Sequence, residues 1–219
     1  MIPPEQNADF VANMENVLDV YKRAYSESNP VVCMDESPKQ LIGETRISKR
    51  TEDGSKIIDY EYSRKGVCNI FMANEPLTGK RLVKVTNRKT KQDWAEFLKD
   101  ISENYPNAQK ITLIMDNLNT HKPGSLYETF SPQEAKKLWD RFEFVYTPKH
   151  GSWLNMAEIE LNVLNGQCLN RRIDNIDTVI KEVAAWQNHR NNKKAKINWQ
   201  FTTKDSRIKL KRLYPSFNA

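Results

Sequence analysis

Two short apolar runs in this chain each end at an aspartate. Residues 31–34 precede Asp35, and residues 111–115 precede Asp116. Apolar runs of this length predict buried strands. A carboxylate at the end of such a strand lies where the core meets solvent, next to the side chains at the end of the neighbouring strand. Two carboxylates about 4 Å apart repel by roughly 4 kcal/mol at an effective dielectric constant near 20, so such a cluster is expected to bind a divalent cation or to share a proton.

The rest of the chain shows helical and strand periodicity around these two runs. Apolar residues at helical spacing predict a helix over residues 7–24, and capping patterns at Thr90 and Ser131 predict two further helix starts. The polar stretch 38–65 is expected to be a long excursion with a short strand at 57–62. Further strands are predicted at 67–73, 81–86 and 142–146, and further helices near 153–168 and 174–190.

This order of elements indicates a mixed sheet covered by helices. Residues 75–79 carry turn chemistry between two strands, so those strands are expected to pair as an antiparallel hairpin. The strand–helix–strand segments that follow are expected to be parallel. Hydrophobic residues make up 38% and charged residues 28% of the chain, which indicates a folded globular protein rather than a disordered one.

Positive charge is concentrated near the C-terminus. The formal net charge of the whole chain is +6, yet residues 161–219 alone carry 12 Lys and Arg against 4 Asp and Glu. This excess favours a polyanion as partner, although a solvated helical surface explains it equally well. The main basic cluster consists of Arg171, Arg172, Arg190, Lys193, Lys194 and Lys196.

The three cysteines, Cys33, Cys68 and Cys168, are far apart and show no metal-finger spacing. Structural zinc is therefore not expected, and the odd number suits a reducing compartment. There is no signal peptide and no apolar run near 20 residues long, so neither export nor membrane insertion is expected.

A third carboxylate for the acidic cluster is expected from the segment after strand 142–146. Glu158 and Glu160 are the candidates, and on a helix they point about 200° apart, so only one can face the cluster. Glu158 shares its helix face with Leu154 and Leu161. The competing interpretation is that residues 155–158 form a helix start with a capping acid at its third position.

Three segments together resemble a known family. They are residues 34–36 (Met-Asp-Glu), 116–121 (Asp-Asn-Leu-Asn-Thr-His) and 146–158, which ends in Trp-Leu-Asn-Met-Ala-Glu. These segments resemble the DDE transposases of bacterial insertion sequences in the mariner superfamily, and the likeness extends to residues 59–62 and 199–203. The resemblance implies an α/β, RNase H-like fold with a mixed five-stranded sheet flanked by helices. The expected organisation is an N-terminal helical linker segment (1–28), a catalytic domain (29–192) and a basic C-terminal tail (193–219).

The resemblance also implies a reaction, namely DNA strand cleavage and transfer that uses two Mg²⁺ or Mn²⁺ ions. It places the catalytic, metal-binding acids at Asp35, Asp116 and Glu158. Hard carboxylate oxygens suit magnesium, and two ions about 3.5–4 Å apart can bind the attacking and leaving oxygens of a phosphodiester. The enzyme would nick transposon ends by hydrolysis and join the freed 3′-hydroxyl to target DNA.

Several neighbouring residues are expected to support this chemistry or to bind DNA. Glu36, Asn117, His121 and Asn155 form the supporting set. Two of them have an equal alternative: Glu36 as a solvated loop residue, and His121 as a loop residue with one structural hydrogen bond. Trp153 is interpreted as a core anchor. The residues expected to contact DNA phosphates are Lys149, His150, Arg171, Arg172, Arg190, Lys193 and Lys194.

Two departures from the family pattern affect the predicted partners. Glu158 follows Asp116 by 42 positions, a longer interval than in many mariner relatives, and the helical segment around 132–139 can absorb the excess. There is no room before Asp35 for helix-turn-helix modules, so a catalytic fragment or a split element with a separately encoded helix-turn-helix portion is expected.

A homodimer is expected in the active complex, in the bacterial cytoplasm at the nucleoid. The alternatives are an inactive or domesticated DNA-binding fragment and a structure-specific nuclease that never integrates DNA.

Overall fold

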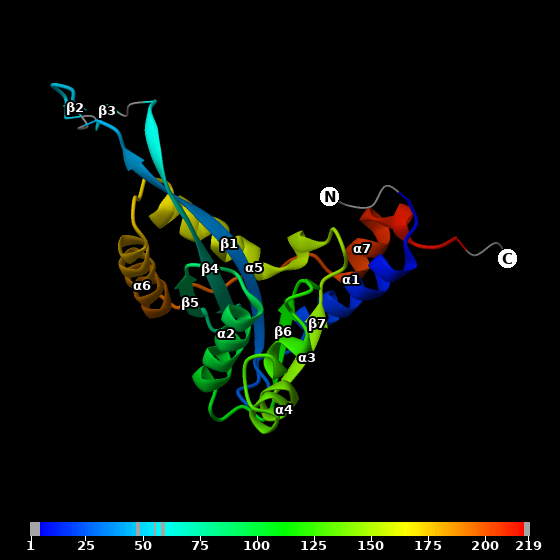
Figure 1. Ribbon diagram of the computed structural model, residues 1–219. Helices are drawn as coiled ribbons and strands as arrows, with labels where there is room; N and C mark the ends of the chain where they lie inside the picture. Colours follow the sequence, from blue (N-terminus) through cyan, green and yellow to red (C-terminus); the bar gives the residue numbers. More distant parts are fainter. Residues whose placement is uncertain (1–4, 47–48, 55, 58–59, 217–219) are drawn as a thin grey trace.

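A five-stranded sheet forms the centre of the computed structural model, which describes residues 5–46, 49–54, 56–57 and 60–216 (Figure 1). In order across the sheet, its strands are β5 (Lys80–Thr86), β4 (Tyr62–Glu75), β1 (Val31–Glu44), β6 (Ile111–Met115) and β7 (Phe142–Tyr146). Strands β1, β6 and β7 are parallel, whereas β4 is antiparallel to both β1 and β5. The predicted mixed sheet and the predicted hairpin are thereby confirmed.

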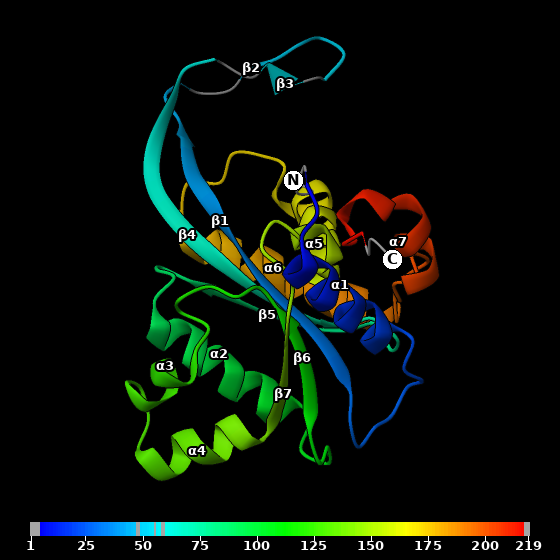
Figure 2. The ribbon, with the colours of Figure 1, turned by 90° about the vertical axis from the view of Figure 1, so that its right-hand side faces the viewer.

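Helices cover both faces of this sheet (Figure 2). One face carries α2 (Lys91–Asn104), α3 (Pro123–Tyr127) and α4 (Pro132–Asp140), and the other carries α1 (Ala8–Tyr21), α5 (Met156–Leu164) and α6 (Ile176–Asn192). Successive residues of a strand point to opposite faces. Accordingly Met34 packs in the core beneath α2, while Cys33 packs in the core beneath α1 and α5.

Two predicted helix starts are present with the predicted capping. Thr90 and Asp93 form a reciprocal capping box at the start of α2. Ser131 caps α4 by accepting a hydrogen bond from the backbone N–H of Glu134 at 3.3 Å. Short polar side chains thus satisfy amide groups that the first turn leaves without partners. The short helix α3 was not predicted, because five residues are too few to show helical periodicity.

The prediction of a long polar excursion over residues 38–65 is wrong. Strand β1 continues to Glu44 and pairs with β4 down to Tyr62, with one irregularity between Leu41 and Ile42. This two-stranded ribbon projects beyond the helices and ends in the short strands β2 (Lys49–Arg50) and β3 (Lys56–Ile57) (Figure 1). Both of its faces are largely solvated, so its sequence lacks the alternation that marks a half-buried strand. Of the strand predicted at 57–62, residues 58–59 lie outside the described part.

The helix predicted near 153–168 consists of three pieces. A short 3-10 turn, η1 (Ser152–Leu154), precedes α5, and a π-helical turn, η2 (Asn165–Leu169), follows it. Asn155 interrupts the first two pieces because its backbone is extended (φ −85°, ψ 113°) while its side chain caps α5. The apolar periodicity runs through all three pieces, which is why the sequence predicted one helix. The last long helix, α6, lies where it was predicted.

The C-terminal segment forms further helical structure in place of a simple tail. Helix α7 (Thr203–Lys209) and the 3-10 turn η3 (Lys211–Leu213) pack against α1, and the backbone N–H of Asn7 donates to the carbonyl of Leu213 at 2.9 Å. Met14 and Val17 of α1 are fully buried in the core. The two ends of the chain therefore fold together, while the predicted boundaries at residues 28 and 192 stay predictions.

Strand β5 is an edge of the sheet, and α6 covers it through side-chain amides. The Asn191 side chain accepts from the N–H of Arg81 and donates to its carbonyl, both at 2.9 Å. The Gln187 side chain accepts from the N–H of Val83 at 2.6 Å. These contacts satisfy backbone groups that an edge strand leaves open. None of the helices within the described ranges has the length and apolarity needed to cross a membrane.

Candidate active site

Asp35 and Asp116 lie where strands β1 and β6 part. The parallel pairing of the two strands ends at Cys33 and Ile114, and both aspartates follow within two residues. Beyond this point β1 continues beside β4, with Asp35 opposite Met72. Continuing the register of β1 and β6 brings the two carboxylates to neighbouring positions at one end of the sheet.

The charges of three acids interact at this place. Burial raises the pKa of Asp35 to about 7, and the nearby negative charges of Glu36, Asp116 and Glu158 raise it too. The backbone N–H of Glu36 donates to Asp35 Oδ1 at 2.8 Å, which opposes the rise. The structure thus brings together the three acids that the sequence singled out, from β1, from the loop after β6 and from the first turn of α5. Their catalytic and metal-binding roles stay predictions.

His121 connects Asp116 to Glu36. Its Nδ1 lies 2.7 Å from Asp116 Oδ1 and its Nε2 lies 3.5 Å from Glu36 Oε1. The imidazole is buried and stacks on the ring of Trp94 at 5.4 Å. Burial opposes a positive charge on His121, but the two carboxylates outweigh it and raise its pKa to about 9. The charged ring therefore compensates part of the negative charge and fixes the loop that carries Asp116.

Glu36 is buried, as its side chain is only 1% exposed. Burial raises its pKa, but His121 and Lys89, whose Nζ lies 3.0 Å from Glu36 Oε1, lower it below the ordinary value. Glu36 is thus a charged residue held among cations beside the cluster. This contradicts its alternative interpretation as a solvated loop residue. No local sequence pattern indicates Lys89 as the partner of Glu36.

Asn155 ties α5 to strand β1. Its side-chain NH₂ donates to the carbonyl of Met34 at 2.8 Å and approaches Asp35 Oδ2 at 3.4 Å. Its Oδ1 accepts from the N–H of Ala157 at 3.1 Å, which caps the helix that carries Glu158. A single buried amide therefore positions two of the three acids. Trp153 packs against the ring of Phe201, in agreement with its interpretation as an anchor.

The two candidate third acids lie in different surroundings. Glu160 is buried and receives hydrogen bonds from Arg81 at 2.6 and 2.7 Å and from Arg190 at 2.8 Å. It is fully engaged in this ion-pair network, so Glu158 is the acid left to face Asp35. Residue Arg190, predicted to bind DNA, is only 17% exposed and is engaged by Glu160. This network could not be predicted from the sequence, because no local pattern distinguishes a buried arginine from an exposed one.

The other residues predicted to bind DNA fall into two places. Lys149 and His150 are exposed in the loop after β7, and His150 has a left-handed backbone (φ 66°), which is uncommon for a residue with a side chain. The remaining residues lie around the two ends of α6. Of these, Arg171 pairs with Glu182 at 2.7 Å, Arg172 pairs with Glu44 at 2.6 Å, and Lys193 and Lys194 are exposed.

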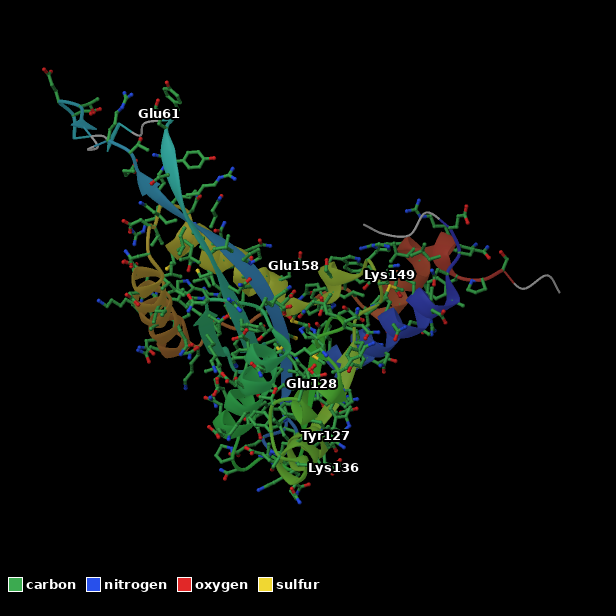
Figure 3. The ribbon with its side chains drawn as sticks, in the orientation of Figure 1. Glu61, Tyr127, Glu128, Lys136, Lys149 and Glu158 are labelled. Atoms are coloured by element: carbon green, nitrogen blue, oxygen red, sulfur yellow. The ribbon has the colours of Figure 1, made fainter. Side chains whose placement is uncertain are left out.

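A hollow of about 660 Å³ adjoins Asp116. It is lined by Asn117, by the loop carrying Lys149 and His150, and by the first turns of α1. Glu158 and Lys149 lie on the same side of the molecule, whereas Lys136 lies at the opposite end (Figure 3). Within the described residues, no three His, Cys, Asp or Glu side chains are arranged to hold a metal ion as they stand. Asp116 instead faces His121.

A family model for DDE superfamily endonucleases matches residues 30–180, which contain all three acids. The chain belongs to the DDE superfamily of endonucleases. Comparison with curated proteins gives no match.

Three solved structures of the Mos1 mariner transposase share the fold of this DDE endonuclease. The paired end complex with Mn superposes with a TM-score of 0.59 at 14% identity, covering 89% of this chain and 60% of that chain. The strand transfer complex gives 0.56 at 13% identity, covering 91% and 65%. The paired end complex with Mg gives 0.54 at 13% identity, covering 99% and 66%. This chain spans less than two thirds of the length of those chains. The predicted RNase H-like fold is confirmed.

Proposed function

We propose that this DDE endonuclease is the catalytic domain of a transposase from a bacterial insertion sequence. It hydrolyses one DNA strand at each transposon end and joins the freed 3′-hydroxyl to target DNA, with two Mg²⁺ or Mn²⁺ ions. The observation that carries the proposal is the electrostatic interaction of Asp35 with Asp116 and Glu158. These three acids come from separate parts of the family region, and a protein that only binds DNA gains nothing from placing them together beside its anionic ligand.

The chemistry of the donors fits a divalent cation. All three side chains offer hard carboxylate oxygens. Burial and, to a smaller extent, the neighbouring negative charges raise the pKa of Asp35, so a cation would stabilise its charged form. When bound, the ions supply charge neutralisation at the attacking and leaving oxygens of the phosphodiester. The Mos1 structures that share this fold include complexes with Mn and with Mg.

The remaining residues of the site position the acids and the DNA. His121 holds the loop of Asp116, and Asn155 fixes Asp35 relative to the helix of Glu158. Lys149 and His150 lie exposed beside the hollow that adjoins Asp116, where they are suited to contact phosphates. Asn117 lines the same hollow and is suited to contact the bound strand.

The proposed partners are transposon-end and target DNA. The structures with this fold are paired-end and strand transfer complexes of Mos1, and these chains are longer than the present one. We therefore include a homodimer in the active complex and a separately encoded helix-turn-helix portion in the proposal. The proposed location is the bacterial cytoplasm, at the nucleoid.

A nicking assay on plasmid DNA that carries the inverted repeats flanking the gene tests this proposal. The wild type should nick only with Mg²⁺ or Mn²⁺ and should form joined products. Asp35→Asn, Asp116→Asn and Glu158→Gln should each abolish nicking while the fold and most DNA binding persist. Glu128→Gln is a matched control, because Glu128 is exposed and lies away from Glu158, toward the end of the molecule that carries Lys136 (Figure 3).

Undiminished nicking by any of the three variants would refute the assigned acids. Metal-dependent nicking without joined products would identify a structure-specific nuclease. DNA binding without nicking by the wild type would identify an inactive or domesticated DNA-binding fragment.

A further inference from the structure

The segment from α7 to η3 carries four exposed cations besides Arg207, which pairs with Glu15. They are Lys204, Lys209, Lys211 and Arg212. None of the four belongs to an ion pair recorded among the described residues. The one acid of this segment, Asp205, is engaged at the start of α7, where it accepts hydrogen bonds from the N–H and the hydroxyl of Thr202 at 2.9 and 2.6 Å.

The acids of the helix beneath α7 do not neutralise this charge. Glu15 of α1 is bound by Arg207 at 2.8 Å and by the hydroxyl of Tyr214 at 2.8 Å. Asp19 of α1 is bound by Lys22 at 2.8 Å and accepts from the Thr203 hydroxyl at 3.0 Å. These contacts engage Glu15 and Asp19, whereas the third acid of α1, Asp9, lies in its first turn and lines the hollow. The four exposed cations are thus held on a fixed surface, which we call the α7 basic surface.

The α7 basic surface continues the surface around the acid cluster. Leu213 of η3 accepts the backbone hydrogen bond from Asn7, the residue that caps α1. Asn7 lines the same hollow as Asp116 and Lys149. Lys211 and Arg212 therefore stand next to the end of α1 that borders this hollow. In Figure 3 Lys149 lies on the side where α1 and α7 pack together.

We infer that the α7 basic surface binds the phosphate backbone of the DNA duplex that flanks the cleaved phosphate. The inference rests on the proposed function, because that function places duplex DNA in the hollow beside Asp116. The start of α7 lies beside Asp19 and Leu213 lies beside Asn7, so the four cations extend along α1 away from the hollow, with Lys211 and Arg212 nearest to it. Spaced cations along such a line match the spaced negative charges of a duplex, and they would contribute independently of sequence. The helices that hold them are packed rather than loose, so the backbone need not be ordered on binding.

A salt titration of DNA binding tests this inference. The full chain is mixed with a fluorescent DNA duplex of arbitrary sequence in EDTA, so that no cleavage occurs, and the affinity is measured from low to moderate salt. The test variant is K204Q/K209Q/K211Q. The matched control is K110Q/K136Q/K137Q, which removes the same number of exposed lysines. Of these, Lys136 lies at the opposite end of the molecule (Figure 3).

The test variant should reduce the slope of log affinity against log salt by about 2.7, since each lost phosphate contact contributes about 0.9. Between 50 and 200 mM salt the affinity should then fall by about 40-fold less than in the wild type. The control should keep the wild-type slope. K204R/K209R/K211R should also keep it, because the charges remain.

An unchanged slope in the test variant, or an equal change in both variants, would overturn the inference. If the triple variant fails to fold, K211Q alone should reduce the slope by about 0.9, and an unchanged slope there would overturn it equally. Because binding is measured without metal, the outcome is separable from the proposed catalysis. If the wild type nicks DNA but the salt slope of the test variant is unchanged, this inference alone is refuted. If the salt slope of the test variant falls but the wild type does not nick DNA, the proposed function alone is refuted.

Discussion

The Nδ1 atom of His121 lies 2.7 Å from Oδ1 of Asp116, and the imidazole is held between that carboxylate and the buried Glu36. The stack on Trp94 leaves the ring little freedom to turn. Asp116 follows the last residue of β6, in a loop whose neighbours Asn117 and Leu118 are exposed. His121 therefore fixes the position of the Asp116 carboxylate, although the loop that carries it faces solvent. We assign His121 as a positioning residue.

His121→Ala should lower the rate of metal-dependent nicking by about 10–100-fold, the usual effect of losing a group that orients a metal ligand. DNA affinity should change much less, because the side chain touches the acid loop rather than the DNA surface. The free energy of unfolding should also fall, because the buried Glu36 loses a cation and Trp94 loses its stacking partner, so the rate is compared under conditions in which the variant is folded. His189→Ala is the control, since His189 is exposed on α6. Steady-state nicking kinetics provide the measurement. An equal loss in both variants, or a loss of His121→Ala activity explained by unfolding, would contradict this assignment.

Glu158 and Glu160 should respond oppositely to loss of charge. Glu160→Gln removes the only carboxylate recorded against Arg81 in the described structure and should cost about 3–5 kcal/mol of unfolding free energy, because buried cations lose their partner. Glu158→Gln should change stability by less than about 0.5 kcal/mol, since the residue is half-buried and has no recorded ion pair in the described part of the chain. Chemical denaturation measures both. Equal stability of the two variants would contradict the assigned network.

Divalent metal should stabilise the folded protein. At a concentration about 100 times its Kd, an ion that binds only the folded state adds about 2.7 kcal/mol. That corresponds to a rise in Tm of roughly 5–10 °C for a chain of this length. Asp116→Asn should lose most of this rise, and Glu128→Gln should keep it. Thermal melts with MgCl₂ or MnCl₂, at ionic strength matched with NaCl, give the measurement. A rise in Asp116→Asn as large as in the wild type would place the bound ion elsewhere.

The contribution of Glu75 to the free energy of unfolding should fall as pH rises. Burial raises its pKa above the ordinary value near 4.5, so the folded state binds the proton more tightly than the unfolded state does. This favourable contribution is complete below pH 4.5 and is lost as pH rises through the folded-state pKa. Glu75→Gln should therefore be more stable relative to the wild type at pH 8 than at pH 4.

Glu143→Gln provides a control of opposite sign. A hydrogen bond from Arg23 lowers the pKa of Glu143, so its contribution to stability is present at neutral pH and lost on acidification. Its substitution should cost stability at pH 7 and less at pH 3. Urea denaturation across this range measures both variants, and the same sign of pH dependence in the two would refute the assignment for Glu75.

The sequence predicted the parts of the molecule that are buried on both sides. Residues 31–34 and 111–115 are continuous apolar runs because helices cover both faces of the central strands. The ends of these two strands could therefore be predicted from the sequence, and Asp35 and Asp116 were found at those ends. The third acid was visible only as a choice between Glu158 and Glu160. That choice depended on Arg81, which is 79 residues away along the chain.

The parts that the sequence missed lack periodicity for physical reasons. The ribbon of β1 and β4 is held by backbone pairing, which any residue type can supply. The contacts of Glu36 with Lys89 and His121 join residues far apart in sequence, so no local pattern reports them. Similarly, α7 is too short and too charged to be distinguished from a basic tail before its packing on α1 is known.

The amide side chains of Asn191 and Gln187 that bind β5 have a consequence for assembly. They occupy backbone groups at which an extended segment of another molecule would otherwise add as a sixth strand. Growth of the sheet by strand addition is thereby blocked on the β5 side. Self-association of this chain must then use side-chain surfaces, the β7 edge of the sheet or the projecting ribbon. Purified protein should resist fibril formation as long as α6 remains packed on β5.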